Sequence, residues 1–227
     1  MPVFEIICLA NSRKLSGRCV AGIKTQAGEW IRPVGPDRDG TLFSQHYTLD
    51  NGTKAQILDL LRIDFVQHRP EPHQPENWVI GQRRWRLLRR PAVQDIGDIL
   101  RSYIDSGPIL LGNTSDRISF HLFRDNPAQA SLALITPEDI EWRITRSVSG
   151  NRQTRAIFGL DGTYYDLVVT DPVWEARLSG FRYGYHPVES TGLQEGDEIF
   201  FTISLGEPFE GSCYKLVAAV IVLSRSF

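Results

Sequence analysis

The sequence predicts a mainly β protein of two small five-stranded β-barrels packed together, with one clear α-helix in the first half. Short apolar runs recur along the chain, and several alternate apolar with polar residues, which is typical of half-buried strands. Clusters of Gly, Pro, Asn and Asp separate these runs. About five runs lie on either side of Asn126-Pro127, so we expect one barrel over residues 1–126 and a second over 127–227.

The first barrel is expected to begin with a three-stranded meander. Its apolar runs cover residues 3–10, 18–24 and 30–34, and a polar stretch over 11–18 predicts a loop between the first two. Residues 60–67 alternate as a fourth strand, and a proline-rich loop follows it. An OB-type barrel has five strands and often a helix between the third and fourth, and the first half fits this loosely.

One segment has helical periodicity. Its apolar positions are Val93, Ile96, Ile99, Leu100 and Ile104. Pro91 suits the first turn of a helix and Gly107-Pro108 suits its end. We therefore expect a helix over about 92–105.

The second half repeats the pattern of short strands. Its expected strands cover residues 131–135, 140–147, 153–160, 163–170, 198–205 and 213–223. Asp161-Gly162 is a strong signal for a tight hairpin. Residues 172–178 predict a short helix, and the continuous apolar run 216–223 predicts a fully buried strand.

Composition is that of an ordinary globular protein, with 41% hydrophobic and 23% charged residues. No apolar run approaches the roughly 18–20 residues that cross a bilayer, and the N-terminus lacks the features of a secretory signal. We therefore expect a cytoplasmic protein with no membrane partner. The three cysteines, Cys8, Cys19 and Cys213, form no C-x-x-C pair and are expected as buried free thiols.

The net charge of −2 argues against coating nucleic acid through bulk charge, but the charges are unevenly placed. Residues 83–101 carry six arginines and two aspartates, a local +4, and residues 141–158 carry four arginines and one glutamate, a local +3. Residues 188–210 carry six acids and no Lys or Arg, a local −6. We therefore expect separate basic and acidic faces.

Motifs for catalysis are absent from the sequence. There is no H-E-x-x-H, C-x-x-C, phosphate-binding G-x-x-x-x-G-K-[ST] or G-x-S-x-G pattern. We therefore expect no catalytic residues, no metal and no cofactor. Two weaker arrangements stay open: Asp166 with Asp171 as a metal-binding pair, and Ser12 with Lys14 as a nucleophile and base.

Arginines beside aromatic residues favour binding of single-stranded nucleic acid, which requires cations for phosphates and rings for bases. The polar loop over 11–18 adds cations among small polar residues that suit an anion. The candidate contacts from these patterns are Asn11, Ser12, Arg13, Lys14, Arg18, Trp30, Arg32, Arg84, Trp85, Arg152, Arg155 and Tyr164. Each such pair also fits a plain strand, with its ring in the core and its arginine in solvent.

Two stretches resemble the bacterial family described as the dual OB-containing domain. They are 8-CLANSRKLSGRCVAG-22, followed by 30-WIRPV-34, and 203-ISLGEPFEGSCYKLVAAVI-221. The resemblance implies two OB-like barrels over nearly the whole chain and recognition of nucleic acid or nucleotides, in genome defence or repair. It places Glu207, Tyr214 and Lys215 in the C-terminal motif and adds Lys215 to the candidate contacts. It carries over no catalytic residue.

Three functions follow. The leading hypothesis is a non-enzymatic protein that binds nucleic acid, single strands in preference to duplex. The first alternative is a protein-protein interaction module that uses the acidic face of residues 188–210. The second is a metal-dependent enzyme that acts on nucleotides.

Overall fold

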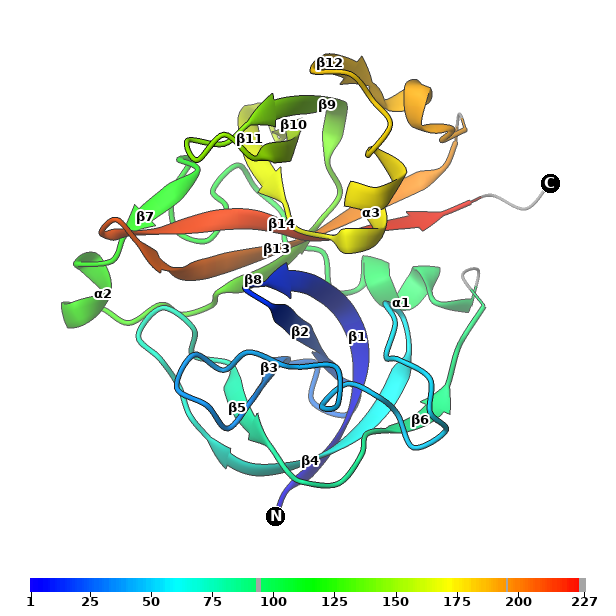
Figure 1. Cartoon of the computed structure of the whole chain (residues 1–227), viewed down its shortest axis with the longest axis vertical. Coiled ribbons are helices and arrows are strands. Elements are labelled where there is room, and N and C mark those ends of the chain that lie inside the picture. The colour runs from blue at the N-terminus through cyan, green and yellow to red at the C-terminus, as the bar shows by residue number, and fades with distance from the viewer. Residues whose placement is uncertain (93–94, 195, 225–227) are drawn as a thin grey trace.

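The computed structural model describes residues 1–92, 95–194 and 196–224, and it confirms the mainly β fold (Figure 1). The strands form two sheets, and few residues are helical. The first sheet contains β1 (Val3–Lys14), β2 (Gly17–Lys24), β3 (Trp30–Val34), β4 (Leu60–His68), β5 (Asn77–Ile80) and β6 (Arg86–Arg89). The second contains β7 (Arg117–Ser119), β8 (Leu132–Ile135), β9 (Glu138–Arg146), β10 (Arg152–Leu160), β11 (Thr163–Val169), β12 (Gly184–Pro187), β13 (Glu198–Phe209) and β14 (Ser212–Leu223).

The first sheet closes into a five-stranded barrel. Its strands follow the order β1-β2-β3-β5-β4, and β1 also pairs with β4. The N-terminal part of β1 pairs with β4 while its remainder continues along β2, so one long strand closes the ring. β3 and β5 are parallel, and β6 extends the sheet beyond β4.

The second sheet repeats this strand order. Its path runs β9-β10-β11-β14-β13-β8, with β12 added beside β9. β8 and β9 are consecutive in sequence and separated only by Thr136-Pro137, so together they take the place that β1 holds in the first barrel. β11 and β14 are parallel, as β3 and β5 are. The duplication lies in the strand order and leaves no visible repeat in the sequence.

The helices are shorter than expected. They are α1 (Gly97–Arg101), α2 (Leu122–Asp125), α3 (Pro172–Arg177) and the 3-10 turn η2 (Val188–Thr191). The helix predicted over 92–105 is confirmed only over α1, and its expected apolar position Val93 lies outside the described residues. After Ile104 the chain turns to β8 instead: the Asp105 N–H donates to the Leu134 carbonyl (2.7 Å) and the Asp105 carboxylate accepts from the Leu134 N–H (3.0 Å). Asp105 therefore bonds to strand β8 instead of continuing the helix.

The helix in the first half does not occupy the usual OB position either. α1 follows β6, whereas the connection between β3 and β4 is an irregular segment over residues 35–59. In the second barrel α3 does lie, along the chain, between β11 and β13, the counterparts of β3 and β4 in the first barrel. The expected boundary near residue 126 remains a prediction, and β7, which precedes it, pairs with β14 of the second sheet.

The two sheets pack together through an apolar core. Leu9 and Ala21 from β1 and β2 meet Phe200 and Ala219 from β13 and β14, and all four are buried. The Thr202 hydroxyl of β13 donates to the Leu9 carbonyl at 2.6 Å. One outer surface of the first barrel is therefore covered by the second (Figure 1). Among the described residues, no helix is long and apolar enough to span a membrane.

Candidate nucleic-acid interface

The expected loop over residues 11–18 is wrong, because these residues form a tight hairpin. β1 continues to Lys14 and β2 begins at Gly17, so the turn is only Leu15-Ser16. The hairpin is also bonded to the second barrel: the backbone N–H of Arg13 donates to the Thr170 carbonyl at 2.8 Å.

Two of the three cations of this hairpin are paired with carboxylates of the second barrel. Arg13 forms an ion pair with Glu175 (2.7 Å), and Lys14 forms one with Glu207 (2.6 Å). Ser12 is buried, with its hydroxyl 3.4 Å from the Cys19 carbonyl. Hence the structure uses Arg13 and Lys14 to join the barrels, and it provides no free Ser12/Lys14 dyad.

Glu207 has two partners from the first barrel. Its other carboxylate oxygen lies 3.0 Å from Nε2 of the buried His73. Burial raises the pKa of Glu207, but the hydrogen bond from His73 and the charge of Lys14 outweigh burial and lower the pKa to about 2. The ionised carboxylate is thus the form that the native contact favours.

This contact predicts a pH dependence of stability. Because the folded-state pKa of Glu207 is depressed from 4.5 to about 2, its contribution is complete above about pH 4.5 and is lost as the pH falls toward 2. Glu207→Gln is expected to lower the free energy of unfolding by about 1 kcal/mol at pH 7, since the side chain is partly exposed. Urea unfolding at pH 7, 4 and 3 measures this difference. A difference that stays constant over this range would contradict the assignment.

Three other candidates lie inside the protein. Trp85 is packed in the core of the first barrel. Arg32 is 1% exposed and donates to the hydroxyls of Ser131 (2.8 Å) and Ser204 (3.1 Å). Lys215 is also 1% exposed. These side chains are enclosed, so their expected direct contact with nucleic acid is wrong in this structure.

Lys215 has a structural role. Its ammonium donates to the carbonyl and the side-chain oxygen of Asn113, both at 2.7 Å, and lies 5.5 Å from the centre of the Tyr165 ring. Burial lowers the pKa of Lys215 to about 8. The sequence could not separate this buried lysine from a surface one, because burial on a β-strand depends on which face is covered.

The arginines of residues 83–90 do not form one uniform patch. Arg84 is exposed and lies with Arg62 and Arg86 around a shallow hollow that also includes Asp50 and Asp64. Arg83 is 3.3 Å from Asp64. Trp30 is half-buried at a different place, against the core between the barrels. Trp30 and Arg32 were expected to contact nucleic acid together. In the structure they do not lie on a common exposed surface.

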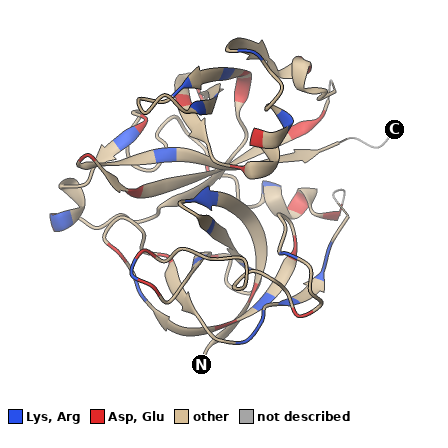
Figure 2. Cartoon of the chain, in the orientation of Figure 1, with Lys and Arg blue, Asp and Glu red and all other residues tan. Residues whose placement is uncertain are grey.

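The second barrel does bring arginines and tyrosines together at its surface. We call this set the arginine–tyrosine patch, and its members are Arg143, Arg146, Arg152, Arg155, Tyr183 and Tyr185. Figure 2 shows Lys and Arg along β9 and β10 at this end of the molecule. Two of the six, Arg152 and Arg155, were expected as contacts from the sequence.

Strand pairing aligns part of the patch in one row. Tyr185 of β12 is opposite Arg143 of β9, and Arg143 is opposite Arg155 of β10. Their neighbours Trp142, Ile144 and Ala156 are buried, so alternation along the strands directs this row away from the core. The Arg143 guanidinium lies 5.9 Å from the centre of the Tyr185 ring.

The rest of the patch lies at the end of the β9–β10 hairpin, where alternation places Arg146 and Arg152 on the strand face opposite to that of Arg143 and Arg155. Arg146 and Arg152 are directly opposite each other, and both guanidinium groups lie near the Tyr183 ring, at 4.9 and 5.4 Å from its centre. Tyr183 is 50% exposed and Tyr185 is 59% exposed. Such cation–π contacts hold rings and guanidinium groups in place without an acidic partner.

Asp166 is part of this surface and is not paired with Asp171. It forms ion pairs with Arg143 (2.5 Å) and Arg155 (2.6 Å). Asp171 is buried and caps α3. The described residues contain no group of three or more His, Cys, Asp or Glu side chains that could hold a metal ion. The alternative in which Asp166 and Asp171 form a metal-binding pair is therefore wrong.

Tyr164 lies near this patch on β11. It is 66% exposed, and its hydroxyl donates to the carboxylate of Asp139 at 3.2 Å. Four residues of the patch were not among the contacts expected from the sequence: Arg143 and Arg146, which were noted only as part of the basic cluster over 141–158, and Tyr183 and Tyr185. A signal was present in the alternation of 181-FRYGYHP-187, but strand β12 has only four residues, and nothing in the sequence shows that it pairs with β9.

The acids of residues 188–210 do not share one face. Glu198 begins β13 and forms an ion pair with Arg101 (2.6 Å), whereas Glu207 lies near the other end of the strand with Lys14. Nine residues of extended strand separate them by about 30 Å. The centre of β13 is buried, so the expected acidic docking face is divided. Glu195 lies outside the described residues.

Asn11 and Arg18, the remaining candidates of the hairpin, line a cleft between the barrels. The Asn11 amide donates to the Ala55 carbonyl at 2.8 Å. No ion pair involves Arg18 among the residues that the structure describes. Of the five candidate contacts in the hairpin (Asn11, Ser12, Arg13, Lys14 and Arg18), only Asn11 and Arg18 line this cleft.

Comparison with known proteins identifies the architecture. The family model described as the dual OB-containing domain matches residues 4–220, which confirms the resemblance of the terminal motifs. No curated protein sequence matches the chain. Two solved structures are similar over nearly the whole chain: "Crystal structure of the tetrameric p202 HIN2" (8% identity, 98% of this chain and 95% of that one, TM-score 0.29) and "Structure of murine DNA binding protein bound with ds DNA" (8% identity, 99% and 100%, TM-score 0.34).

Proposed function

The chain belongs to the dual OB-containing domain family, and we propose that it binds single-stranded nucleic acid on the arginine–tyrosine patch of its second barrel. The observation that carries this proposal is that arginines meet exposed tyrosine rings along the β9–β10 ribbon, Arg143 with Tyr185 on one face and Arg146 and Arg152 with Tyr183 at the hairpin end. Phosphates require cations and unpaired bases require aromatic faces. A cytoplasmic setting and a role in genome defence or repair belong to the same proposal.

The location of the patch supports the proposal. OB-type barrels bind oligonucleotides on the face of their second and third strands and on the adjoining loops. In the second barrel these strands are β10 and β11, and the β9–β10 hairpin is the loop between the first and second strands. In the first barrel the corresponding hairpin, at Leu15-Ser16, is packed against the second barrel. The second barrel therefore has the open face.

The charge of the patch also supports the proposal. Four arginines and the carboxylate of Asp166 leave a net charge of +3. Arg152 donates to the backbone carbonyls of Leu178 (3.0 Å) and Phe181 (2.6 Å), which fixes its guanidinium at the surface. A fixed guanidinium loses little entropy when it contacts a phosphate.

Removing the hairpin arginines is expected to flatten the salt dependence of binding. Each phosphate contact contributes about 0.7 to the slope of log K against log salt for single strands. The double variant Arg146→Met with Arg152→Met should therefore reduce the slope by about 1.4. Fluorescence anisotropy of a labelled oligo-dT between 50 and 200 mM salt measures this change.

The matched control is Arg117→Met. Arg117 is also exposed and also contacts a tyrosine, since its guanidinium lies 5.5 Å from the centre of the Tyr214 ring. It belongs to β7, outside the patch. The control should keep the wild-type slope. If both variants change the slope equally, binding depends on overall charge and the patch is not the site.

A further inference from the structure

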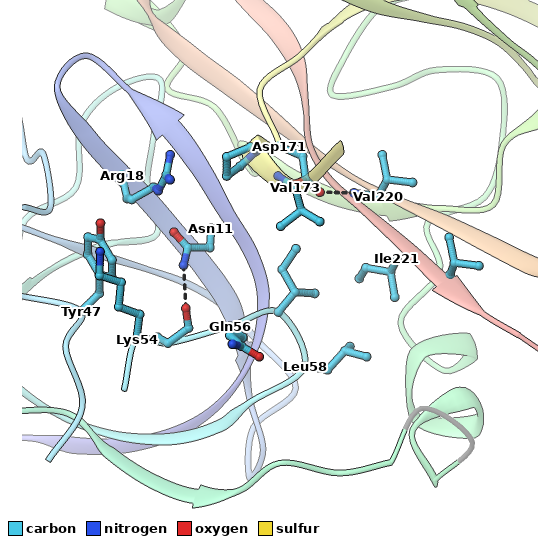
Figure 3. A pocket seen from close by; sticks show the side chains of 14 residues that line it. Asn11, Arg18, Tyr47, Lys54, Gln56, Leu58, Asp171, Val173, Val220 and Ile221 are labelled. Atoms are coloured by element: carbon cyan, nitrogen blue, oxygen red, sulfur yellow. Dashed lines mark hydrogen bonds between the residues drawn. The ribbon is translucent and has the colours of Figure 1, made fainter. Parts of the chain in front are cut away.

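A cleft of about 510 Å³ lies between the two barrels, apart from the arginine–tyrosine patch (Figure 3). The first barrel supplies Asn11 and Arg18 from its hairpin, together with Tyr47 and residues 54–58. The second supplies residues 171–173 and 220–222. Its volume is within the range of small-molecule sites, and it shares no residue with the patch.

One side of the cleft is cationic. Arg18 and Lys54 line it, and among the residues that the structure describes neither forms an ion pair. Lys54 lies 5.8 Å from the centre of the Tyr47 ring. The remaining charged residue, Asp171, is 1% exposed. Its two oxygens accept hydrogen bonds from the backbone N–H groups of Val173, Trp174 and Val220, and the charge of Arg18 acts on this carboxylate without forming an ion pair with it.

The other side of the cleft is apolar. It is formed by Ile57, Leu58, Val173, Ile221 and Val222, and Figure 3 shows Leu58, Val173 and Ile221 on the side away from Lys54 and Tyr47. Val173 is 71% exposed although it is a large aliphatic side chain. An exposed apolar surface beside two unpaired cations suits a ligand that is itself half apolar and half anionic.

The positions of the walls are fixed by contacts between segments. Asn11 holds the 55–58 segment through the Ala55 carbonyl, and the Leu58 N–H donates to the Cys8 carbonyl at 2.7 Å. Asp171 holds β14 through the Val220 N–H at 2.9 Å. The cleft is therefore preformed, and binding would not require its walls to be ordered.

We propose that this cleft binds a small organic phosphate, with the phosphate at Arg18 and Lys54 and the apolar body against Ile57, Val173 and Ile221. Two cations suit a phosphate dianion, and guanidinium can donate two parallel hydrogen bonds to it. A mononucleotide fits this description, and phenyl phosphate is the smallest compound that does.

Isothermal titration calorimetry of the full chain tests this site with phenyl phosphate and with AMP. We expect saturable binding with one site per chain. Inorganic phosphate and adenosine, which each carry one half of the chemistry, should bind at least about tenfold more weakly. Arg18→Met and Lys54→Met should each weaken binding about tenfold, the loss of one charge-assisted contact.

Two controls separate this site from the proposed function and from misfolding. Arg124→Met removes an exposed arginine of α2, outside the cleft, and should bind as the wild type does. Arg146→Met with Arg152→Met should keep AMP binding even where it weakens oligo-dT. Thermal unfolding in the absence of ligand should be the same for Lys54→Met, which changes an exposed side chain, and the wild type.

Three results would overturn the proposal. They are no saturable binding of either compound, binding that is unchanged in both Arg18→Met and Lys54→Met, and equal affinity for inorganic phosphate and AMP. The last would show that the apolar side takes no part.

Discussion

Asp171→Ala is expected to lower the free energy of unfolding by about 2–4 kcal/mol. The Asp171 carboxylate accepts three backbone hydrogen bonds from two elements: Val173 (2.9 Å) and Trp174 (3.3 Å) of α3, and Val220 (2.9 Å) of β14. Loss of a helix cap costs about 1 kcal/mol, and each buried donor left without a partner costs about 1–3 kcal/mol.

The position of Asp171 explains this size. Burial raises the pKa of the carboxyl, and the three N–H donors together with the charge of Arg18 oppose the increase. Trp174, which the cap orients, is buried and packs against Trp142 with ring centres 5.1 Å apart. Loss of the cap would therefore disturb both α3 and the core of the second barrel.

Urea unfolding at pH 7, followed by circular dichroism, measures the change. Asp171→Asn is the matched control, because its amide oxygen can still cap α3 while its amide group faces the Val220 N–H without accepting from it. Its loss should be intermediate. A change below 1 kcal/mol for Asp171→Ala would mean that water replaces the carboxylate and that the cap is not structural.

The strands were predictable from the sequence because their signals are local. Alternation of apolar and polar residues and the turn residues between runs are visible without knowledge of the partner strands. The hairpin over residues 11–18 shows the limit. Its polar composition indicated a loop, but pairing with β2 extends β1 to Lys14, and a backbone bond to Thr170 and ion pairs with Glu175 and Glu207 hold the hairpin against the second barrel. These partners are more than 150 residues away.

The candidate site was predictable only in part, for the same reason. Arg152 and Arg155 lie in a local basic cluster and could be singled out. Tyr183 and Tyr185 join them because β12 pairs with β9, a contact between segments about 40 residues apart. Arg32 resembles any exposed arginine on a strand until the second barrel covers it. The relation between the barrels thus decides which cations face solvent.

Replacing both patch tyrosines should produce the largest loss of binding. Tyr183→Ala with Tyr185→Ala is expected to weaken oligo-dT binding at least about 30-fold, because stacking on an aromatic ring contributes about 1–3 kcal/mol per base. The rings also contact Arg143, Arg146 and Arg152 through cation–π contacts, so their removal takes away one of the contacts that position these arginines. Anisotropy at fixed salt measures the change in Kd.

Two controls test whether the loss comes from the rings of the patch. Tyr183→Phe with Tyr185→Phe keeps both rings and should bind within about twofold of the wild type, since stacking requires the ring and not the hydroxyl. Phe209→Ala removes an equally exposed ring, 63% exposed, from the far end of β13, and should leave binding unchanged. Wild-type affinity in the double alanine variant would exclude the patch as the binding site. A loss in the double phenylalanine variant would assign the contact to hydrogen bonding instead of stacking, and the preference for single strands would lose its physical basis.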